Sequence, residues 1–130
     1  MEFTTEENGA KVVICAAPLM EAFNLKSLIQ KALLTNNIKL EEALDNDIFS
    51  ILMALDSSPE IFEAMFKCLE KSTYNNIKIT KETFEPEQAR ADLYEVFYYC
   101  LKVNVYPFFK SLLSKFGSGF MMAPHEEDPK

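Results

Sequence analysis

The chain has 130 residues, a net charge of −7 at pH 7 and a hydrophobic content of 48%. That length suits one domain, and that composition is typical of a folded protein rather than a disordered one. The negative charge and the lack of a Lys/Arg cluster argue against a nucleic-acid partner, because affinity for phosphates comes from clustered cations. No uncharged run approaches the roughly 18 residues of a membrane span, and the N-terminus lacks the features of a signal peptide, so we expect a cytoplasmic protein without a membrane partner.

The N-terminal residues predict a β-hairpin. Residues 3–5 and 11–14 are β-prone, and Asn8-Gly9 between them tolerates the positive φ angles of a tight turn. Pro18 then opens an amphipathic helix that we expect to end at Asn36-Asn37. Its apolar residues recur at helical spacing: Ala22, Leu25, Ile29, Ala32 and Leu33.

Two further helices are predicted in the middle of the chain. The first lies within residues 40–55, where Ile48, Ile51, Leu52 and Leu55 form a helical stripe. The second begins at Pro59, because Ser58 can accept a hydrogen bond from the exposed amides of the first turn and proline suits the first helical position. Its apolar face is formed by Ile61, Phe62, Met65, Phe66 and Leu69.

The C-terminal half predicts a short strand and one long helix. Ile77 and Ile79 alternate with polar residues, which is the period of a strand. Pro86 opens the last and longest helix, whose apolar stripe changes direction near Pro107. Proline cannot donate a hydrogen bond to the carbonyl four residues earlier and crowds it, so the helix should kink or break there.

Catalytic chemistry finds little support among the residue types present. The only histidine, His125, lies in the polar tail, and a nucleophilic serine or cysteine needs a base beside it. Cys15, Cys68 and Cys100 are far apart and each is flanked by apolar residues, so we expect three buried free thiols. No glycine-rich phosphate loop and no metal-ligand spacing occur, so we expect no catalytic residue, no cofactor and no metal.

The long C-terminal helix carries more apolar surface than one face requires. Tyr99, Val103 and Tyr106 lie opposite the face that Val105 and Leu112 belong to. A helix that is apolar nearly all round is either central in its own fold or shared with another chain. Tyrosines offer a large, stiff contact area with one polar end, so these three residues are the candidate partner or oligomer interface.

These elements predict a mainly α fold. We expect a compact helical domain of four or so helices with a small N-terminal β-hairpin over residues 1–116. Residues 117–130, with two glycines, two prolines and a terminal acidic run, are expected to be a flexible acidic tail. A homo-oligomer is expected from the apolar surface of the last helix.

The order of motifs resembles that of the tail assembly chaperones of long-tailed bacteriophages. The similarity runs from about Phe3 to Phe116, and its most specific part is the series "KCLEKSTYN", "ITKETF", "ARAD" and "CLKVNVYPFFKSL". The resemblance implies a non-enzymatic protein of the host cytoplasm that binds the tape measure protein, aids polymerisation of the tail tube protein and leaves before the virion is complete. The alternatives are a permanent structural or adaptor protein of a phage tail, or a small cytoplasmic enzyme with an unrecognised site.

Overall fold

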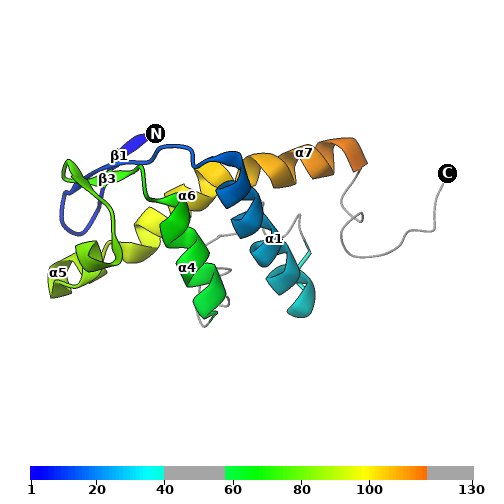
Figure 1. The fold of residues 1–130 in the computed structure, drawn as a ribbon, viewed down its shortest axis with the longest axis horizontal. Helices are drawn as coiled ribbons and strands as arrows, with labels where there is room; N and C mark the ends of the chain where they lie inside the picture. The colour runs from blue at the N-terminus through cyan, green and yellow to red at the C-terminus, as the bar shows by residue number, and fades with distance from the viewer. Residues whose placement is uncertain (40–57, 117–130) are drawn as a thin grey trace.

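A computed structural model describes residues 1–39 and 58–116 of the chain (Figure 1). The predicted helix within residues 40–55 and the predicted tail lie outside these residues. The elements, in chain order, are β1 (Glu2–Thr4), β2 (Lys11–Val13), α1 (Leu19–Thr35), α4 (Pro59–Cys68), β3 (Thr73–Tyr74), β4 (Ile77–Lys78), the 3-10 turn η1 (Lys81–Phe84), α5 (Glu87–Arg90), α6 (Leu93–Asn104) and α7 (Tyr106–Phe116). The predicted mainly α fold with an N-terminal hairpin is confirmed.

The strands form one antiparallel sheet in the order β1-β2-β3-β4. The first hairpin turns at Gly9, whose φ of 63° glycine adopts without strain. The second turns at Asn75 and Asn76, with φ angles of 53° and 69°. The predicted strand near Ile77 is present as β4, but its partner β3 was not predicted, although two asparagines between β-prone residues are a typical hairpin turn.

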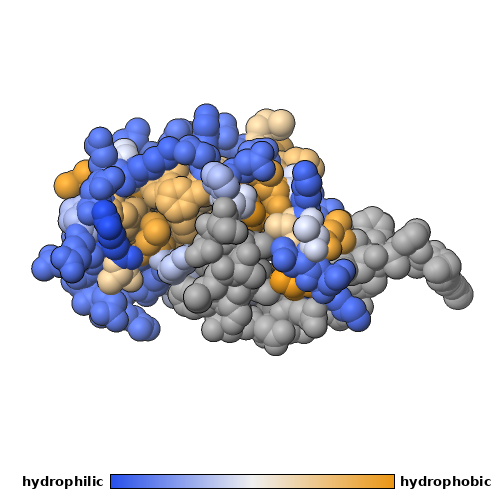
Figure 2. All heavy atoms as spheres, turned by 90° about the horizontal axis from the view of Figure 1, so that it is seen from below, coloured by the Kyte–Doolittle hydropathy of each residue, from blue (hydrophilic) through white to orange (hydrophobic). Residues whose placement is uncertain are grey.

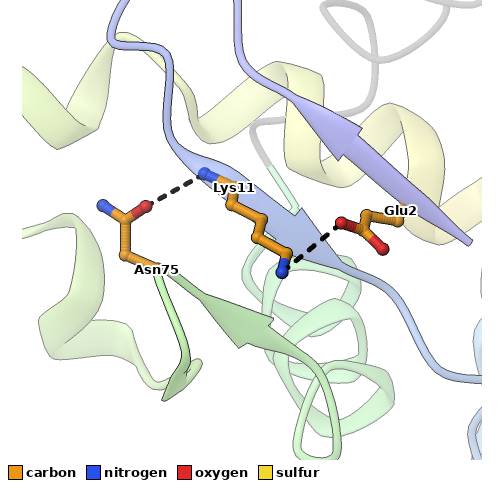
Figure 3. A network of polar contacts seen from close by, with 3 residues as sticks. All are labelled: Glu2, Lys11 and Asn75. Atoms are coloured by element: carbon orange, nitrogen blue, oxygen red, sulfur yellow. Dashed lines mark hydrogen bonds and ion pairs between the residues drawn. The ribbon is translucent and has the colours of Figure 1, made fainter.

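Lys11 of β2 links β1 to the turn between β3 and β4 (Figure 3). Its backbone N–H donates to Asn75 Oδ1 at 2.9 Å, and its carbonyl accepts from the Asn75 N–H at 2.7 Å. Its Nζ lies 3.6 Å from Glu2 Oε2 on β1. That ion pair is exposed and contributes little, so the backbone pairing holds the two hairpins together.

Helices α1 and α4 pack against each other and descend side by side from the axis formed by α6 and α7 (Figure 1). Helix α4 begins as predicted, with Pro59 in its first turn and Ser58 Oγ accepting from the Ile61 N–H at 3.3 Å. Helix α1 follows Pro18 and has no side-chain cap. It ends at the predicted position, where Asn37 adopts a φ of 57°.

The predicted long C-terminal helix is divided in two places. The break at Pro107 is confirmed, because α6 ends at Asn104 and α7 begins at Tyr106. A second break at Ala91 and Asp92 was not predicted, so a single helix from Pro86 was wrong. The N–H groups of these two residues donate to carbonyls three residues earlier, which tightens the turn and separates α5 from α6.

One hydrophobic core joins the sheet to α1, α4 and α6. Leu25, Met65, Leu69 and Val96 are among its most completely buried side chains. The rings of Phe62, Phe66, Phe84 and Phe97 extend it between α4, η1 and α6, with neighbouring centroids 5.2 to 6.1 Å apart. Tilted and edge-on pairs of this kind add to the stabilisation that burial provides.

Candidate functional site

The three thiols occupy different environments. Cys68 and Cys100 are buried, as expected, but Cys15 is exposed beyond the end of β2, so the expectation of three buried thiols was wrong for Cys15. Its backbone N–H donates to Ser72 Oγ at 3.0 Å, which places the main chain and leaves the side chain at the surface. Neighbouring side chains of an extended segment point to opposite sides. The Ile14 side chain is buried, so the Cys15 side chain points outward.

Neither buried thiol has the environment of a nucleophile. Burial, with a smaller effect from the negative charge of Glu21, raises the pKa of Cys68 to about 11. Burial also raises the pKa of Cys100. Both thiols therefore stay protonated at neutral pH, the unreactive form. Among residues 1–39 and 58–116, no three His, Cys, Asp or Glu side chains lie where they could hold a metal ion.

A buried carboxylate joins the two hairpins to α6. Asp92 Oδ2 accepts from the Tyr74 hydroxyl at 2.6 Å and from Asn8 Nδ2 at 2.9 Å. Burial, followed by the hydrogen bond to Asp92 and its charge, raises the pKa of Tyr74 to about 12. Asp92 Oδ1 has no hydrogen-bond partner within the described residues. The Oδ2 contacts come from the β1–β2 turn and from β3, so Asp92 acts as a structural joint.

The predicted interface residues form a half-buried band on α6 and the start of α7. The Tyr99 ring packs on Phe3 of β1 with centroids 4.1 Å apart, so part of its surface is used by the fold. Val103 and Tyr106 are also partly buried against the core. The ammonium of Lys102 lies 5.9 Å from the Tyr106 ring centroid. Tyr99 and Val103 lie one turn apart on α6 and Tyr106 begins α7, and their role in binding stays a prediction.

Sequence reasoning missed a second apolar surface, on the outer side of α1. Six large hydrophobic side chains are exposed among the described residues, and four of them belong to this helix. They are Leu19 (68% exposed), Met20 (73%), Phe23 (45%) and Leu34 (40%). The signal was present, because these residues lie outside the stripe of Ala22, Leu25, Ile29 and Leu33 that was predicted to be buried. The leftover apolar residues indicate a second face.

Phe23 connects this outer side of α1 to α7. Its ring meets the Phe108 ring edge-on, with centroids 5.8 Å apart. The ammonium of Lys26 lies 4.2 Å from the Phe23 centroid and donates to Gln30 Oε1 at 3.1 Å. Burial lowers the pKa of Lys26. We call Leu19, Met20, Phe23 and Phe108 the α1–α7 surface.

Asn104 fixes the position of α1 relative to the last two helices. Its Oδ1 accepts from the Ala17 N–H at 2.8 Å, just before α1 begins, and its Nδ2 donates to the Cys100 carbonyl at 3.1 Å. Asn104 is buried and is the last residue of α6. The start of α1 is therefore held at the break between α6 and α7, which explains why Phe23 and Phe108 meet.

Apolar residues also reach the surface on the side of the molecule shown in Figure 2. A group of them lies beside α4 and is bordered by hydrophilic residues, and smaller groups lie toward α1 and α7. Phe62 is the half-buried member of the aromatic cluster on α4. No helix in residues 1–39 or 58–116 has both the length and the hydropathy needed to cross a membrane.

Comparison with known proteins identifies the family. The family described as "Phage tail assembly chaperone protein, TAC" matches residues 3–117, which is most of the chain. No curated protein and no solved structure matches it. Membership in this family supports a non-enzymatic role in tail assembly and agrees with the resemblance in the sequence motifs. The chain belongs to the phage tail assembly chaperone family.

Proposed function

We propose that this protein covers apolar helical segments of the phage tape measure protein and releases them when tail tube protein polymerises. The proposal rests chiefly on the family match over residues 3–117. Large apolar side chains exposed on α1, a helix that also supplies part of the core, add to it. A protein that contacts tail proteins only during assembly needs such a surface in its free form.

The physical chemistry of long helical partners supports this role. An amphipathic helix without its partners exposes an apolar stripe and aggregates, and a second apolar helical surface can cover that stripe. The net charge of −7 keeps the chain and its complex soluble. We place this activity in the host cytoplasm, before the virion is complete.

Co-expression tests the proposal. The tape measure protein of the same phage would be expressed alone, with this chain, and with an unrelated acidic helical protein of similar size. We expect the tape measure protein to become soluble and to co-purify only with this chain. An insoluble tape measure protein in all three cases would contradict the proposal. Finding the chain in purified virions in a fixed ratio to the tube protein would instead favour a permanent structural role.

We also propose that Tyr99, Val103 and Tyr106 mediate self-association. They lie together on α6 and the start of α7, and each is partly exposed. Sedimentation of the double variant Tyr99→Ala/Tyr106→Ala should give monomers where the wild type gives oligomers, with helical circular dichroism retained. Tyr94→Ala is the matched control, because Tyr94 is a half-buried tyrosine of α6 that lies five positions before Tyr99 and therefore on a different side of the helix. A wild-type chain that is monomeric at micromolar concentration would refute this proposal.

A further inference from the structure

We propose that the α1–α7 surface binds an amphipathic helix that carries acidic residues beside its apolar stripe. The inference rests on the proposed function and goes beyond it, because it names a binding surface and the chemistry of the bound segment. The surface is distinct from the band of Tyr99, Val103 and Tyr106, whose Tyr99 ring packs on Phe3 of β1.

The arrangement of residues along α1 separates a core side from a binding side. Leu19 and Phe23 are one helical turn apart, and Met20 lies beside them. The buried row faces α4 and consists of Ala22, Leu25, Ile29 and Leu33. Phe108 of α7 extends the outer side by its edge-on contact with Phe23. A helix laid on this surface would meet anchors one turn apart, which is how amphipathic helices bind apolar grooves.

Charge around this surface opposes that of the whole chain. Residues 19–39 and 105–116 contain five lysines and one acidic residue, Glu21, whereas residues 1–10 and 59–95 contain eleven acidic and five basic residues. Lys26, Lys31, Lys110 and Lys115 take part in none of the ion pairs found among the described residues. Lys26 in addition lies against the Phe23 ring. Acidic groups on a bound helix would supply counter-charges at the edge of an apolar contact.

The same charge pattern argues against an anionic lipid surface as the occupant. A chain with a net charge of −7 is repelled by such a membrane as a whole, and four or five lysines near one surface give only limited attraction. A second copy of this chain has acidic residues to offer but already has a separate candidate contact on α6. A helical partner with both apolar and acidic residues matches the apolar anchors and the lysines together.

Substitution of exposed residues tests the apolar part. Overlapping synthetic peptides that span the tape measure protein of the same phage would be titrated against the wild type, against Leu19→Ser/Phe23→Ser and against Ile77→Ser. Ile77 is the control because it is 70% exposed on β4 and lies outside the α1–α7 surface. We expect the double variant to bind the best peptide at least about tenfold more weakly and the control to bind within about twofold of wild type.

Charge reversal tests the electrostatic part with the apolar residues intact. Lys31→Glu/Lys115→Glu, which changes the lysines nearest to Met20 and Phe108 around their helices, should weaken binding several-fold, and more at low than at high salt. Lys71→Glu/Lys78→Glu changes the net charge equally on the opposite part of the molecule and should have little effect. Replacing Asp and Glu of the bound peptide with Asn and Gln should weaken binding to the wild type and abolish its salt dependence.

Each outcome bears on one of the two proposals. If the wild type binds no tape measure peptide and does not solubilise the protein, the proposed function fails. If the wild type binds and Leu19→Ser/Phe23→Ser binds equally well, the function stands and this surface is refuted. Loss of self-association in that variant with peptide binding retained would make a second copy the occupant, and binding to phosphatidylglycerol vesicles through the same residues would make it a lipid surface. Both results would overturn the inference. If the double variant loses its circular dichroism signal, the charge-reversal pairs decide.

Discussion

Helices α1 and α4 begin in similar ways and are used differently. Each follows or contains a proline at its start, and the two pack against each other. Helix α4 carries its own cap at Ser58 and buries most of its apolar residues. Helix α1 has no side-chain cap and leaves Leu19, Met20 and Phe23 exposed near its start. The fold accounts for the apolar residues of α4, whereas those of α1 exceed what the fold uses.

This difference shows how a small domain can be stable and still expose an apolar surface. The stabilising contacts of α1 come from one row of side chains and from a hydrogen bond made before the helix begins. The outer row contributes the edge-on contact of Phe23 with Phe108 and is otherwise largely exposed. Substitutions on the two sides of α1 and α4 should separate stability from binding.

The largest expected effect is on the aromatic core of α4. Phe66→Ala removes a buried ring that contacts Phe62, Phe84 and Phe97, and should lower the free energy of unfolding by about 3 to 5 kcal/mol. Phe23→Ala removes a ring that is 45% exposed and should cost about 1 kcal/mol or less. Urea unfolding followed by circular dichroism measures both free energies. Equal losses of stability would contradict the view that α4 uses its apolar residues for the fold and that the outer side of α1 does not.

The second-largest effect on stability is expected from removing the hydrogen bonds that hold the starts of α1 and α4. Asn104→Ala leaves the Ala17 N–H without its acceptor in a partly buried place, which should cost about 1 to 3 kcal/mol. Ser58→Ala removes the local cap of α4 and should cost about 1 kcal/mol. Only the first change should alter peptide binding at the α1–α7 surface. Binding that falls equally in both variants would mean that α1 is not specifically placed by Asn104.

Alkaline pH tests the polar joint that lies outside both helices. The folded-state pKa of Tyr74 is about 12, above the ordinary value of about 10, so its contribution to stability is complete below pH 10 and is lost as the pH rises toward 12. Tyr74→Phe should lower stability at pH 8 and show a smaller decline than wild type between pH 10 and 12. Parallel curves for the two proteins would contradict a role for the Tyr74–Asp92 hydrogen bond in this loss.

The smallest effect is on thiol reactivity, which reports on the contact between α1 and α4. Cys68 Sγ lies 3.4 Å from the Glu21 carbonyl of α1, and its pKa is raised to about 11. Without denaturant, a thiol reagent should label Cys15 rapidly and Cys68 and Cys100 slowly. Asn104→Ala should accelerate labelling of Cys68 more than Ser58→Ala does. Rapid labelling of Cys68 in the wild type would show that the α1–α4 contact opens readily.

Much of the local structure could be predicted from the residues that begin and end elements. Pro59, Asn36-Asn37 and Pro107 each act on the backbone at their own position, so their effects need no tertiary contact. The break at Ala91 and Asp92 and the strand β3 could not be predicted as easily. Asp92 is joined to Tyr74 and Asn8, and β3 pairs with β2, so both depend on residues distant in sequence.

The candidate surfaces also differ in how far they could be predicted from local sequence. Tyr99, Val103 and Tyr106 were selected from helical spacing alone, on the expectation of one continuous helix, whereas Tyr106 begins α7 after the break. That Tyr99 packs on Phe3 could not be read from spacing, since it depends on where the hairpin lies. The α1–α7 surface requires the contact between Phe23 and Phe108, which are 85 positions apart. Only the excess of apolar residues at the start of α1 was visible in the sequence.

The pairing of β2 with β3 also sets an order for synthesis. Val12 pairs with Tyr74, 62 positions later, so the sheet cannot close until the ribosome has made α1, α4 and everything between. At about 5 to 20 residues per second this takes about 3 to 12 s, and for most of that time α4, on which the buried side of α1 packs, has not yet been made. The nascent chain therefore exposes more apolar surface than the folded protein. During its own synthesis it is exposed to the same kind of aggregation that we propose it prevents in its partner.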